Sequence, residues 1–271
     1  MHHRPEGART IRIMWWNCRF GSTADDIIRQ IKLEHPDILF LFESQHTPDA
    51  GSQSVHDSIA TTFSLSESQH RFVQSAKRGR RGLDGTSVFC FSPDLLCEQI
   101  SHYHLSKGGR FGGKGPATRN LVEVGLWSET KQTVVRIGGI HASYGWPLFN
   151  RARLREELRE TEFHIRNSNH PYLLGGDFNT PVMSVCGILK RSNGSRMLVP
   201  ILPLEAKRVH SRHGFRMTVG SCSLLNVRSK HITRVIDFCL THTDLVPAIS
   251  SVRYRGFGPS NHRSLIVELS I

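Results

Sequence analysis

The feature that most constrains the fold of this chain is an uninterrupted apolar run, ILFLF, at residues 38–42. A strand that is apolar on both faces is typical of a sheet with other layers packed on each side. Before it, residues 24–31 carry apolar side chains at helical spacing, between a Ser22 or Thr23 N-cap and a helix-ending His35-Pro36 pair. Residues 11–16 predict an earlier strand. Strand, helix and strand within about thirty residues indicate an α/β unit.

Similar patterns predict that strands continue to the end of the chain. Strands are predicted at residues 86–91, 121–127, 133–140, 172–174, 235–240 and 265–269. A helix that Asn150 caps would place Leu154, Leu158 and Ile165 on one face. Residues 44–70 show no clear pattern, and no repeat or linker divides the chain. We therefore expect a flexible N-terminal segment, residues 1–10, and a single α/β domain over residues 11–271.

Charge and cysteine content limit the partners and the compartment. The 271 residues include 35 lysines and arginines against 23 acidic residues, a net charge of +12, which favours nucleic acid or an anionic lipid surface as partner. Six cysteines without a CxxC pair favour a reducing compartment. No signal-peptide core or membrane-spanning run is evident. These features predict a cytoplasmic protein, with an exported effector or toxin as the alternative.

The segment at residues 172–181, YLLGGDFNTP, is the first candidate for chemistry. Asp177 and Asn179 stand two positions apart, so on an extended backbone both side chains point to the same face. The two glycines before them would leave room for a substrate, and Pro181 would end the strand. A carboxylate and a carboxamide placed together can contact a phosphate and its attacking water. Because Asp and Asn also favour ordinary turns, the pattern needs support from other segments.

Other predicted strands end in, or contain, polar residues that could converge with this segment. They are Asn17, Glu43, His141, Asp237 and the pair Asn261-His262. Glu43 and Asn17 offer the oxygen ligands that Mg²⁺ prefers, unless they are an ordinary strand end and turn. Asp237 lies in an apolar strand, where an unpaired carboxylate is costly, so we expect a histidine partner. The alternative for Asp237 is a structural pairing with Arg234.

Taken in chain order, these segments resemble the endonuclease/exonuclease/phosphatase superfamily, and in particular its deoxyribonuclease-like members. The segments that carry the resemblance are Trp16-Asn17, Leu41-Phe42-Glu43, Gly85–Phe89, Thr118-Arg119-Asn120, His141-Ala142-Ser143, Gly175–Asn179, Ile236-Asp237-Phe238 and Ser260-Asn261-His262. They extend over nearly the whole chain. The resemblance implies an α/β fold, a four-layer sandwich of two packed mixed β-sheets flanked by helices.

The resemblance also implies a metal site and a water-activating group. Glu43, assisted by Asn17, would bind Mg²⁺ or Mn²⁺ beside the scissile phosphate. Asp177 would position or deprotonate the attacking water, and Asn179 would orient it and contact the phosphate. This division of labour is chemically coherent, because phosphodiester hydrolysis needs charge neutralisation and an aligned water.

The remaining implied roles belong to two histidines and an arginine. His262 would bind a phosphoryl oxygen or transfer a proton, with Asp237 fixing its ring. His141 would be a second histidine of the site, and Arg119 would contact phosphate. The family's last segment usually reads Ser-Asp-His, whereas Asn261 here replaces the aspartate as a metal ligand, so we expect a lower metal affinity. A natural variant with altered metal use, an inactivated or engineered protein and a binding protein of the same fold are the three explanations.

Two basic stretches bear on the substrate. Residues 77–82 hold four cations in six positions, and residues 107–119 add four more among five glycines. Cations on glycine-rich loops can follow a phosphate backbone without reading bases. Together with the resemblance, they make a metal-dependent DNA endonuclease of low sequence specificity, acting as a monomer, the leading hypothesis. RNA cleavage and exonucleolytic attack are also compatible with the sequence. A lipid or inositol phosphate phosphoesterase and a catalytically impaired binding protein are the alternatives.

Overall fold

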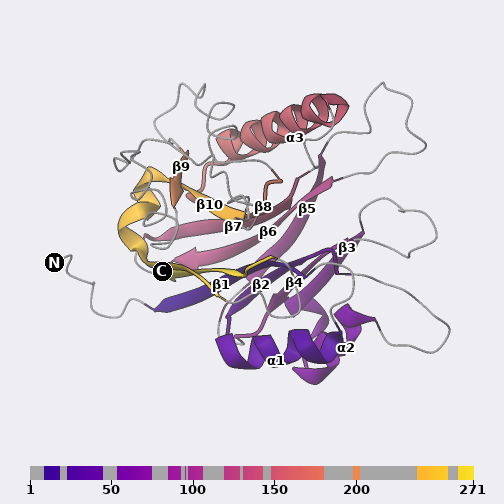
Figure 1. Ribbon diagram of the computed structural model, residues 1–271. Coiled ribbons are helices and arrows are strands. Elements are labelled where there is room, and N and C mark those ends of the chain that lie inside the picture. The colour runs from indigo at the N-terminus through magenta and orange to yellow at the C-terminus, as the bar shows by residue number, and fades with distance from the viewer. Residues whose placement is uncertain are drawn as a thin grey trace, which may run out of the picture.

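The computed structural model describes residues 9–18, 23–44, 54–74, 85–92, 95, 97–105, 119–128, 131–142, 148–179, 198–201, 237–255 and 262–271. These residues form two six-stranded sheets that pack face to face (Figure 1). The first sheet has the order β11 (Ile249–Tyr254), β12 (Leu265–Ser270), β1 (Thr10–Asn17), β2 (Ile38–Phe42), β4 (Gly85–Cys90) and β3 (His70–Gln74). The second has the order β5 (Cys97–Leu105), β6 (Arg119–Ser128), β7 (Thr133–His141), β8 (Tyr172–Asp177), β10 (Asp237–His242) and β9 (Leu198–Ile201).

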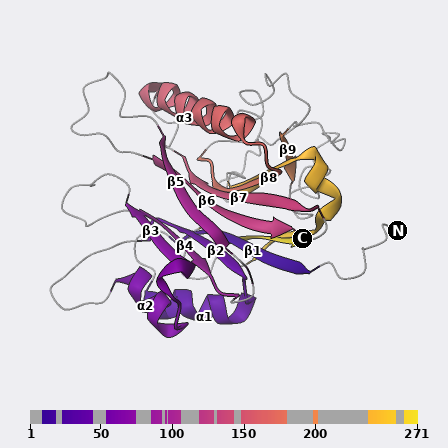
Figure 2. The same cartoon turned by 180° about the vertical axis from the view of Figure 1, so that it is seen from behind.

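Helices on both outer faces complete four layers, as Figures 1 and 2 show from opposite sides. α1 (Ala24–Glu34) and α2 (Val55–Thr62) cover the first sheet, and α3 (Leu148–Asn167) covers the second. Short 3₁₀ helices span Glu67–Gln69 and Thr243–Ala248. Both sheets are mixed, because β1 runs parallel to β2 and β7 to β8, while the other pairs are antiparallel. The predicted four-layer α/β sandwich is confirmed.

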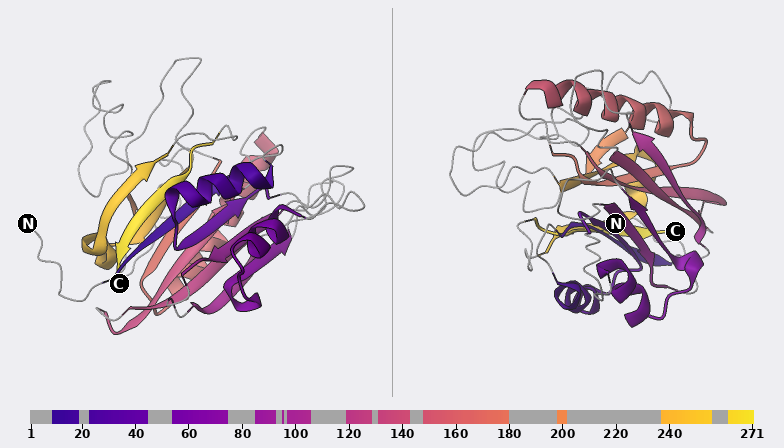
Figure 3. Two further views of the ribbon diagram at one scale, coloured as in Figure 1. Left: turned by 90° about the horizontal axis from the view of Figure 1, so that it is seen from below. Right: turned by 90° about the vertical axis from the view of Figure 1, so that its right-hand side faces the viewer.

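The apolar run of β2 is buried on both faces, as predicted. Phe40 and Phe42 belong to the core between the two sheets, whereas Leu39 and Leu41 belong to the core that the first sheet forms with α1 and α2. The right-hand view of Figure 3 shows the sheets between α3 on one side and α1 and α2 on the other. On the outer face of the second sheet, α3 supplies three side chains to a third core, namely Leu154, Leu158 and Ile165.

The helix boundaries follow from local capping, with one correction. Thr23 caps α1 by accepting a hydrogen bond from the Asp26 N–H, and the helix ends at His35, whose φ of 46° is left-handed. The predicted cap of the third helix is wrong, because α3 begins at Leu148 and Asn150 lies inside it. A proline at position 147 is the competing start signal in the sequence.

Five elements were not predicted from the sequence, namely α2, β3, β5, β9 and β11, and the four strands among them are the edge strands of the two sheets. α2 is only eight residues long, and one of its buried positions is a histidine, His56. β3 and β5 are edge strands rich in polar residues, so neither shows the apolar run of a central strand. The strand predicted at residues 235–240 is β10, which starts at Asp237 and continues to His242; residues 235–236 lie outside the described part.

Glycines in β7 and β8 allow the two sheets to approach closely. A Cβ atom at Gly175 would lie 2.5 Å from the Trp15 ring, and one at Gly139 would lie 2.3 Å from Phe40. The Trp15 and Phe40 rings stack with centroids 5.9 Å apart, and the Trp15 indole donates a hydrogen bond of 2.9 Å to the Gly138 carbonyl. The expectation that Gly175 leaves room for a substrate is therefore wrong, since an aromatic side chain of the opposite sheet fills that room.

Gly175→Ala is expected to lower the free energy of unfolding by about 2 kcal/mol and Tm by about 4–8 °C, because its methyl group would overlap the Trp15 ring. Gly125→Ala is the matched control, since a Cβ there would meet only Val134, at 3.3 Å. Thermal unfolding of both variants checks this. Equal changes in Tm would contradict the close approach of the sheets at Gly175.

Among the described residues, no helix is both long and apolar enough to cross a membrane.

Candidate functional site

Four strands end, and a fifth begins, at one edge of the sandwich. In the first sheet, the parallel strands β1 and β2 place Asn17 beside Phe42, the residue before Glu43. In the second sheet, His141 at the end of β7 pairs with Asp177 at the end of β8, and Asp177 pairs with Asp237 at the start of β10. Adjacent strand ends therefore bring residues that are far apart in sequence to a common edge.

Asp177 lies at the centre of this group and is only 1% exposed. Its Oδ2 accepts a hydrogen bond of 2.9 Å from the Asn17 Nδ2, which joins the two sheets. Its Oδ1 accepts a hydrogen bond of 2.8 Å from the backbone N–H of Asn179. Asn179 has a left-handed φ of 50°, and its side-chain amide donates to the Ala142 carbonyl at 2.8 Å. The Asp177 carboxylate is thus fixed by partners from β1 and from its own turn.

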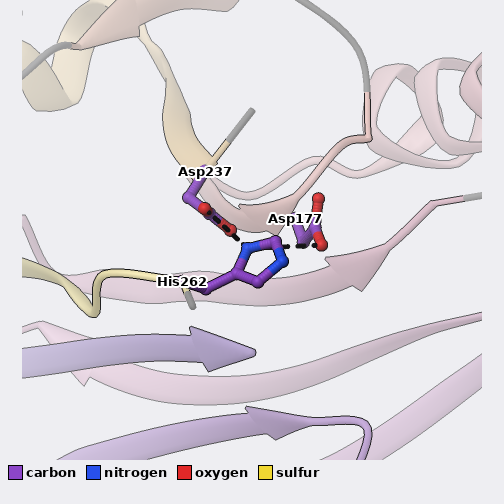
Figure 4. A group of neighbouring side chains, drawn as sticks. All are labelled: Asp177, Asp237 and His262. Atoms are coloured by element: carbon purple, nitrogen blue, oxygen red, sulfur yellow. Dashed lines mark hydrogen bonds and ion pairs between the residues drawn. The ribbon is translucent and has the colours of Figure 1, made fainter. Parts of the chain in front are cut away.

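Asp237 and His262 form a hydrogen-bonded pair beside Asp177 (Figure 4). The His262 Nδ1 lies 3.0 Å from the Asp237 Oδ2 and 3.7 Å from the Asp177 Oδ2. A proton on Nδ1 is needed to donate to the Asp237 carboxylate, so the hydrogen bond with Asp237 does not involve Nε2. The Tyr254 hydroxyl donates to the backbone carbonyl of Asp237 at 2.5 Å and anchors the start of β10.

Glu43 and His141 form a second acid–histidine pair. The His141 Nε2 lies 3.4 Å from the Glu43 Oε1 and 3.9 Å from the Asp177 Oδ2. The Glu43 backbone is left-handed, with φ 53°, a conformation that a residue with a side chain adopts only when its surroundings hold it. The His141 ring also lies against Phe42, with ring centroids 6.0 Å apart. Glu43 is therefore close to the Asp177–His262 group rather than remote from it.

The buried acids and His262 shift one another's pKa. Burial and the neighbouring Asp237 carboxylate raise the pKa of Asp177 to about 7, against opposing effects of His262, Asn17 and the Asn179 N–H. Burial also raises the pKa of Asp237, although its hydrogen bond with His262 opposes this. Burial alone would lower the pKa of His262, but its hydrogen bond to Asp237 and the surrounding carboxylates leave that pKa raised. These groups titrate as one coupled set.

The donor set suits a hard divalent cation. The carboxylates of Asp177 and Asp237 lie on either side of the His262 Nδ1, and the Glu43 carboxylate lies 3.4 Å from the His141 Nε2. Burial raises the pKa values of Asp177 and Asp237, and a cation would stabilise their charged forms. Asp177, Asp237 and His262 each offer one ligand atom within 4.8 Å of the others. The His262 Nδ1 is already hydrogen-bonded to Asp237, however, so we assign that pair to orientation of the ring.

Several residues that the sequence predicts for the site lie wholly or partly outside the described part of the chain. Asn261 lies outside the described residues, as do the basic stretch at 77–82, most of that at 107–119 and Ser143. Arg119 begins β6, two residues before Leu121, which pairs with Ile140 in β7; its side chain is outside the described part. Tyr254 was missed, because a tyrosine whose hydroxyl donates to a backbone carbonyl leaves no motif in the sequence.

Comparison with known proteins agrees with this geometry. A model of the Endonuclease/Exonuclease/phosphatase family matches residues 14–262, whereas none of the curated proteins compared matches the chain. The solved endonuclease/exonuclease/phosphatase from Beutenbergia cavernae DSM 12333 aligns with a TM-score of 0.67 at 18% identity, over 97% of this chain and 72% of that one.

Two further solved structures are similar over almost their full lengths. The mannosyl-6-phosphatase Bt3783 from Bacteroides thetaiotaomicron VPI-5482 has a TM-score of 0.57 and 14% identity, over 96% of this chain and 100% of its own. TDP2 from D. rerio, complexed with a single-strand DNA product, has a TM-score of 0.57 and 13% identity, over 96% and 98%. The chain belongs to the Endonuclease/Exonuclease/phosphatase family of phosphate-ester hydrolases.

Proposed function

We propose that this protein is a divalent-metal-dependent phosphodiesterase that cleaves the nucleic acid backbone, acting on DNA as an endonuclease of low sequence specificity. The observation that carries the reaction is the meeting of Asp177 with two acid–histidine pairs at one edge of the sandwich. A base, a proton donor and an oxygen-rich cation site within a few ångströms are what hydrolysis of a phosphate ester requires.

In this proposal Asp177 accepts the proton of the attacking water. A pKa of about 7 makes its carboxylate a base matched to neutral pH, and the hydrogen bonds from Asn17 and Asn179 hold its two oxygens in place. The side-chain amide of Asn179 fixes this turn through the Ala142 carbonyl. The chain thus presents the base in one orientation before substrate arrives.

His262 completes the proton transfer on the other side of the phosphate. Its hydrogen bond to Asp237 and the surrounding carboxylates raise its pKa, which favours the protonated ring, and Nε2–H can then donate to a phosphoryl or leaving oxygen. Asp237 holds the ring by its Nδ1, and His141, whose Nε2 lies 3.9 Å from the Asp177 Oδ2, would contact another phosphate oxygen. We assign Arg119 and Asn261 supporting contacts to phosphate and metal on the resemblance alone.

Glu43, with the carbonyl oxygen of Asn17, would hold Mg²⁺ or Mn²⁺ at this edge. A divalent cation bound there supplies neutralisation of the phosphate charge. The chain's contribution is to fix the Glu43 carboxylate by its left-handed backbone and its contact with His141.

The distribution of charge along the chain supports nucleic acid as the substrate. The described residues hold nearly equal numbers of basic and acidic side chains, so the excess lies in the connecting segments. Four of these, residues 75–84, 106–118, 180–197 and 202–236, hold 17 of the 35 lysines and arginines but only two acids. Each leaves or re-enters the sheets at the site edge, where Gln74 pairs with Gly85, Leu105 pairs with Arg119, β8 ends and β10 begins. Such an excess of basic side chains suits a nucleic acid, which carries many phosphates along its backbone, better than a small phosphosugar.

Plasmid nicking tests the proposal. With Mg²⁺ or Mn²⁺ we expect conversion of supercoiled to nicked plasmid, abolished by a chelator and by His262→Ala. Replacing the four cations at Lys77, Arg78, Arg80 and Arg81 by serine should raise KM for DNA and flatten its salt dependence, while hydrolysis of a small chromogenic phosphodiester stays unchanged. If the protein hydrolyses phosphosugars or phosphoinositides and leaves the plasmid intact, the nuclease proposal is wrong and the protein is a phosphatase. Tight DNA binding without turnover would identify a binding protein.

A further inference from the structure

A second group of polar side chains, outside the pocket, forms an unbroken chain of hydrogen bonds. It consists of His70 at the start of β3, His56 in α2, Ser87 in β4 and Ser44. His70 Nδ1 lies 3.0 Å from His56 Nε2, His56 Nδ1 lies 3.0 Å from Ser87 Oγ, and Ser87 Oγ lies 2.9 Å from Ser44 Oγ. We call these four residues the Ser–His chain. It links α2 and β3, through Ser87 of β4, to Ser44, the residue that follows Glu43.

Three of the four members are buried, so each polar atom needs a defined partner. Ser44, Ser87 and His56 are 1%, 0% and 6% exposed. Ser44 donates to the Gly85 carbonyl at 3.4 Å, so its oxygen accepts the Ser87 proton, and the Ser87 oxygen in turn accepts Nδ1–H of His56. This order of donors fixes the His56 tautomer and leaves its Nε2 to accept from His70. The direction of the whole chain is therefore set.

The end point of the chain decides what it can do. The last proton points at the backbone carbonyl of Gly85 and not at the Glu43 carboxylate, so the chain does not deliver protons to the pocket. What it does fix is the position of Ser44 against β4. On the other side of Glu43, Phe42 is held by its pairing with Thr86, and its carbonyl accepts from the Cys18 N–H at 3.1 Å. Glu43 thus lies between two anchored residues.

We propose that the Ser–His chain is a positioning device that holds the Glu43 carboxylate in its metal-binding place. It rests on the proposed function, in which Glu43 binds the divalent cation. Glu43 has a left-handed φ of 53°, which is a strained conformation for a residue with a side chain. If Ser44 were released, Glu43 could relax to an extended backbone. Relaxation at Glu43 would move its carboxylate away from His141, 3.4 Å distant, and from the rest of the pocket. His56 is then a positioning residue that acts on the metal through two serines.

Direct titration of the metal-free protein with Mn²⁺ in a calorimeter tests this without relying on turnover. Ser44→Ala, at the end of the Ser–His chain, and His56→Leu, inside it, should each raise the Kd for Mn²⁺ about tenfold or more. At saturating Mn²⁺ the kcat should stay within about twofold of wild type, because the catalytic groups themselves are unchanged. His56→Asn should recover most of the affinity, since its amide nitrogen can donate to Ser87 in place of Nδ1.

His164→Leu is the matched control. His164 is also a histidine on a helix that hydrogen-bonds to a buried strand residue, at 2.9 Å from Glu123, but it has no link to Glu43. This variant should lower Tm while leaving the Kd for Mn²⁺ unchanged. If His56→Leu does not fold, Ser44→Ala decides alone.

The outcomes separate the two proposals. Mn²⁺ binding that is lost in Glu43→Gln but unchanged in Ser44→Ala and His56→Leu would overturn the positioning role and leave the proposed function intact. Binding that is unaffected by Glu43→Gln would overturn both, because Glu43 would then not hold the metal. A rise in Kd that His56→Asn does not relieve, and that His164→Leu shares, would show general destabilisation and also overturn the positioning role.

Discussion

Asp177→Asn is expected to lower kcat/KM for DNA by about 10³-fold, within the range that general base catalysis contributes. The substitution keeps the size of the side chain but removes its ability to take a proton from water, and one of the two accepting oxygens becomes an amide group that cannot accept. Asp177 is the one carboxylate of the pocket that is almost completely buried and held at both oxygens. The measurement is the initial rate of plasmid nicking at pH 7.5 with saturating Mn²⁺. A variant that keeps more than about a tenth of the wild-type rate would exclude Asp177 as the base.

The same substitution should stabilise the metal-free protein at alkaline pH. The pKa of Asp177 is about 7 in the folded protein, whereas an aspartate in an unfolded chain titrates at about 3.9. Between these values the folded state keeps a proton that the unfolded state has released, so the free energy of unfolding falls as pH rises from about 4 to about 7. The amide that replaces the carboxyl group in the variant cannot titrate. Near pH 4 the two proteins should therefore have similar Tm values, and at pH 8 the variant should have the higher one.

This Tm comparison also controls for folding of the variant. Added Mn²⁺ should raise the Tm of the wild type at pH 8 by more than that of Asp177→Asn, since the ion neutralises a charge that only the wild type carries there. A variant that is less stable than wild type at pH 8 would show that the loss of activity comes from disrupted packing.

Most of the candidate site residues can be picked from the sequence because they stand at the ends of predicted strands. Asn17, Glu43, His141 and Asp177 each follow or close an apolar run, and parallel neighbours place such ends side by side. Asp237 is different, since it opens an antiparallel strand and meets Asp177 across the ladder. That pairing depends on strand order, which periodicity does not encode.

The parts that the sequence does not predict depend on contacts between the layers. In the sequence, Gly175 suggests space for a substrate, but in the structure the Trp15 ring of the other sheet packs against it. The positive φ of Glu43 has no local signal, because glutamate does not favour that conformation. His56 reads as one of 16 histidines, and only the fold brings it to Ser87. Tertiary packing, rather than local pattern, determines these features.

Substitutions in the hydrogen-bonded pair of His262 and Asp237 should give the second large loss of activity. His262→Ala removes the imidazole and is expected to lower kcat by about 10³-fold. Asp237→Asn keeps the imidazole but removes the carboxylate that orients it, and is expected to lower kcat by about 10²-fold or more. The acidic limbs of their kcat/KM–pH profiles should shift in opposite directions. Asp237 raises the pKa values of Asp177 and His262, so Asp237→Asn should move both limbs of the profile to lower pH.

His262→Ala should change the profile in the opposite sense. The His262 cation lowers the pKa of Asp177, so its removal should move the acidic limb to higher pH, and the alkaline limb that reports deprotonation of His262 should disappear. Asp244→Asn, the same change just beyond the other end of β10, is the matched control and should leave both limbs in place. Acidic limbs that move in the same direction in Asp237→Asn and His262→Ala would contradict the coupling, because the two side chains carry opposite charges beside one carboxylate.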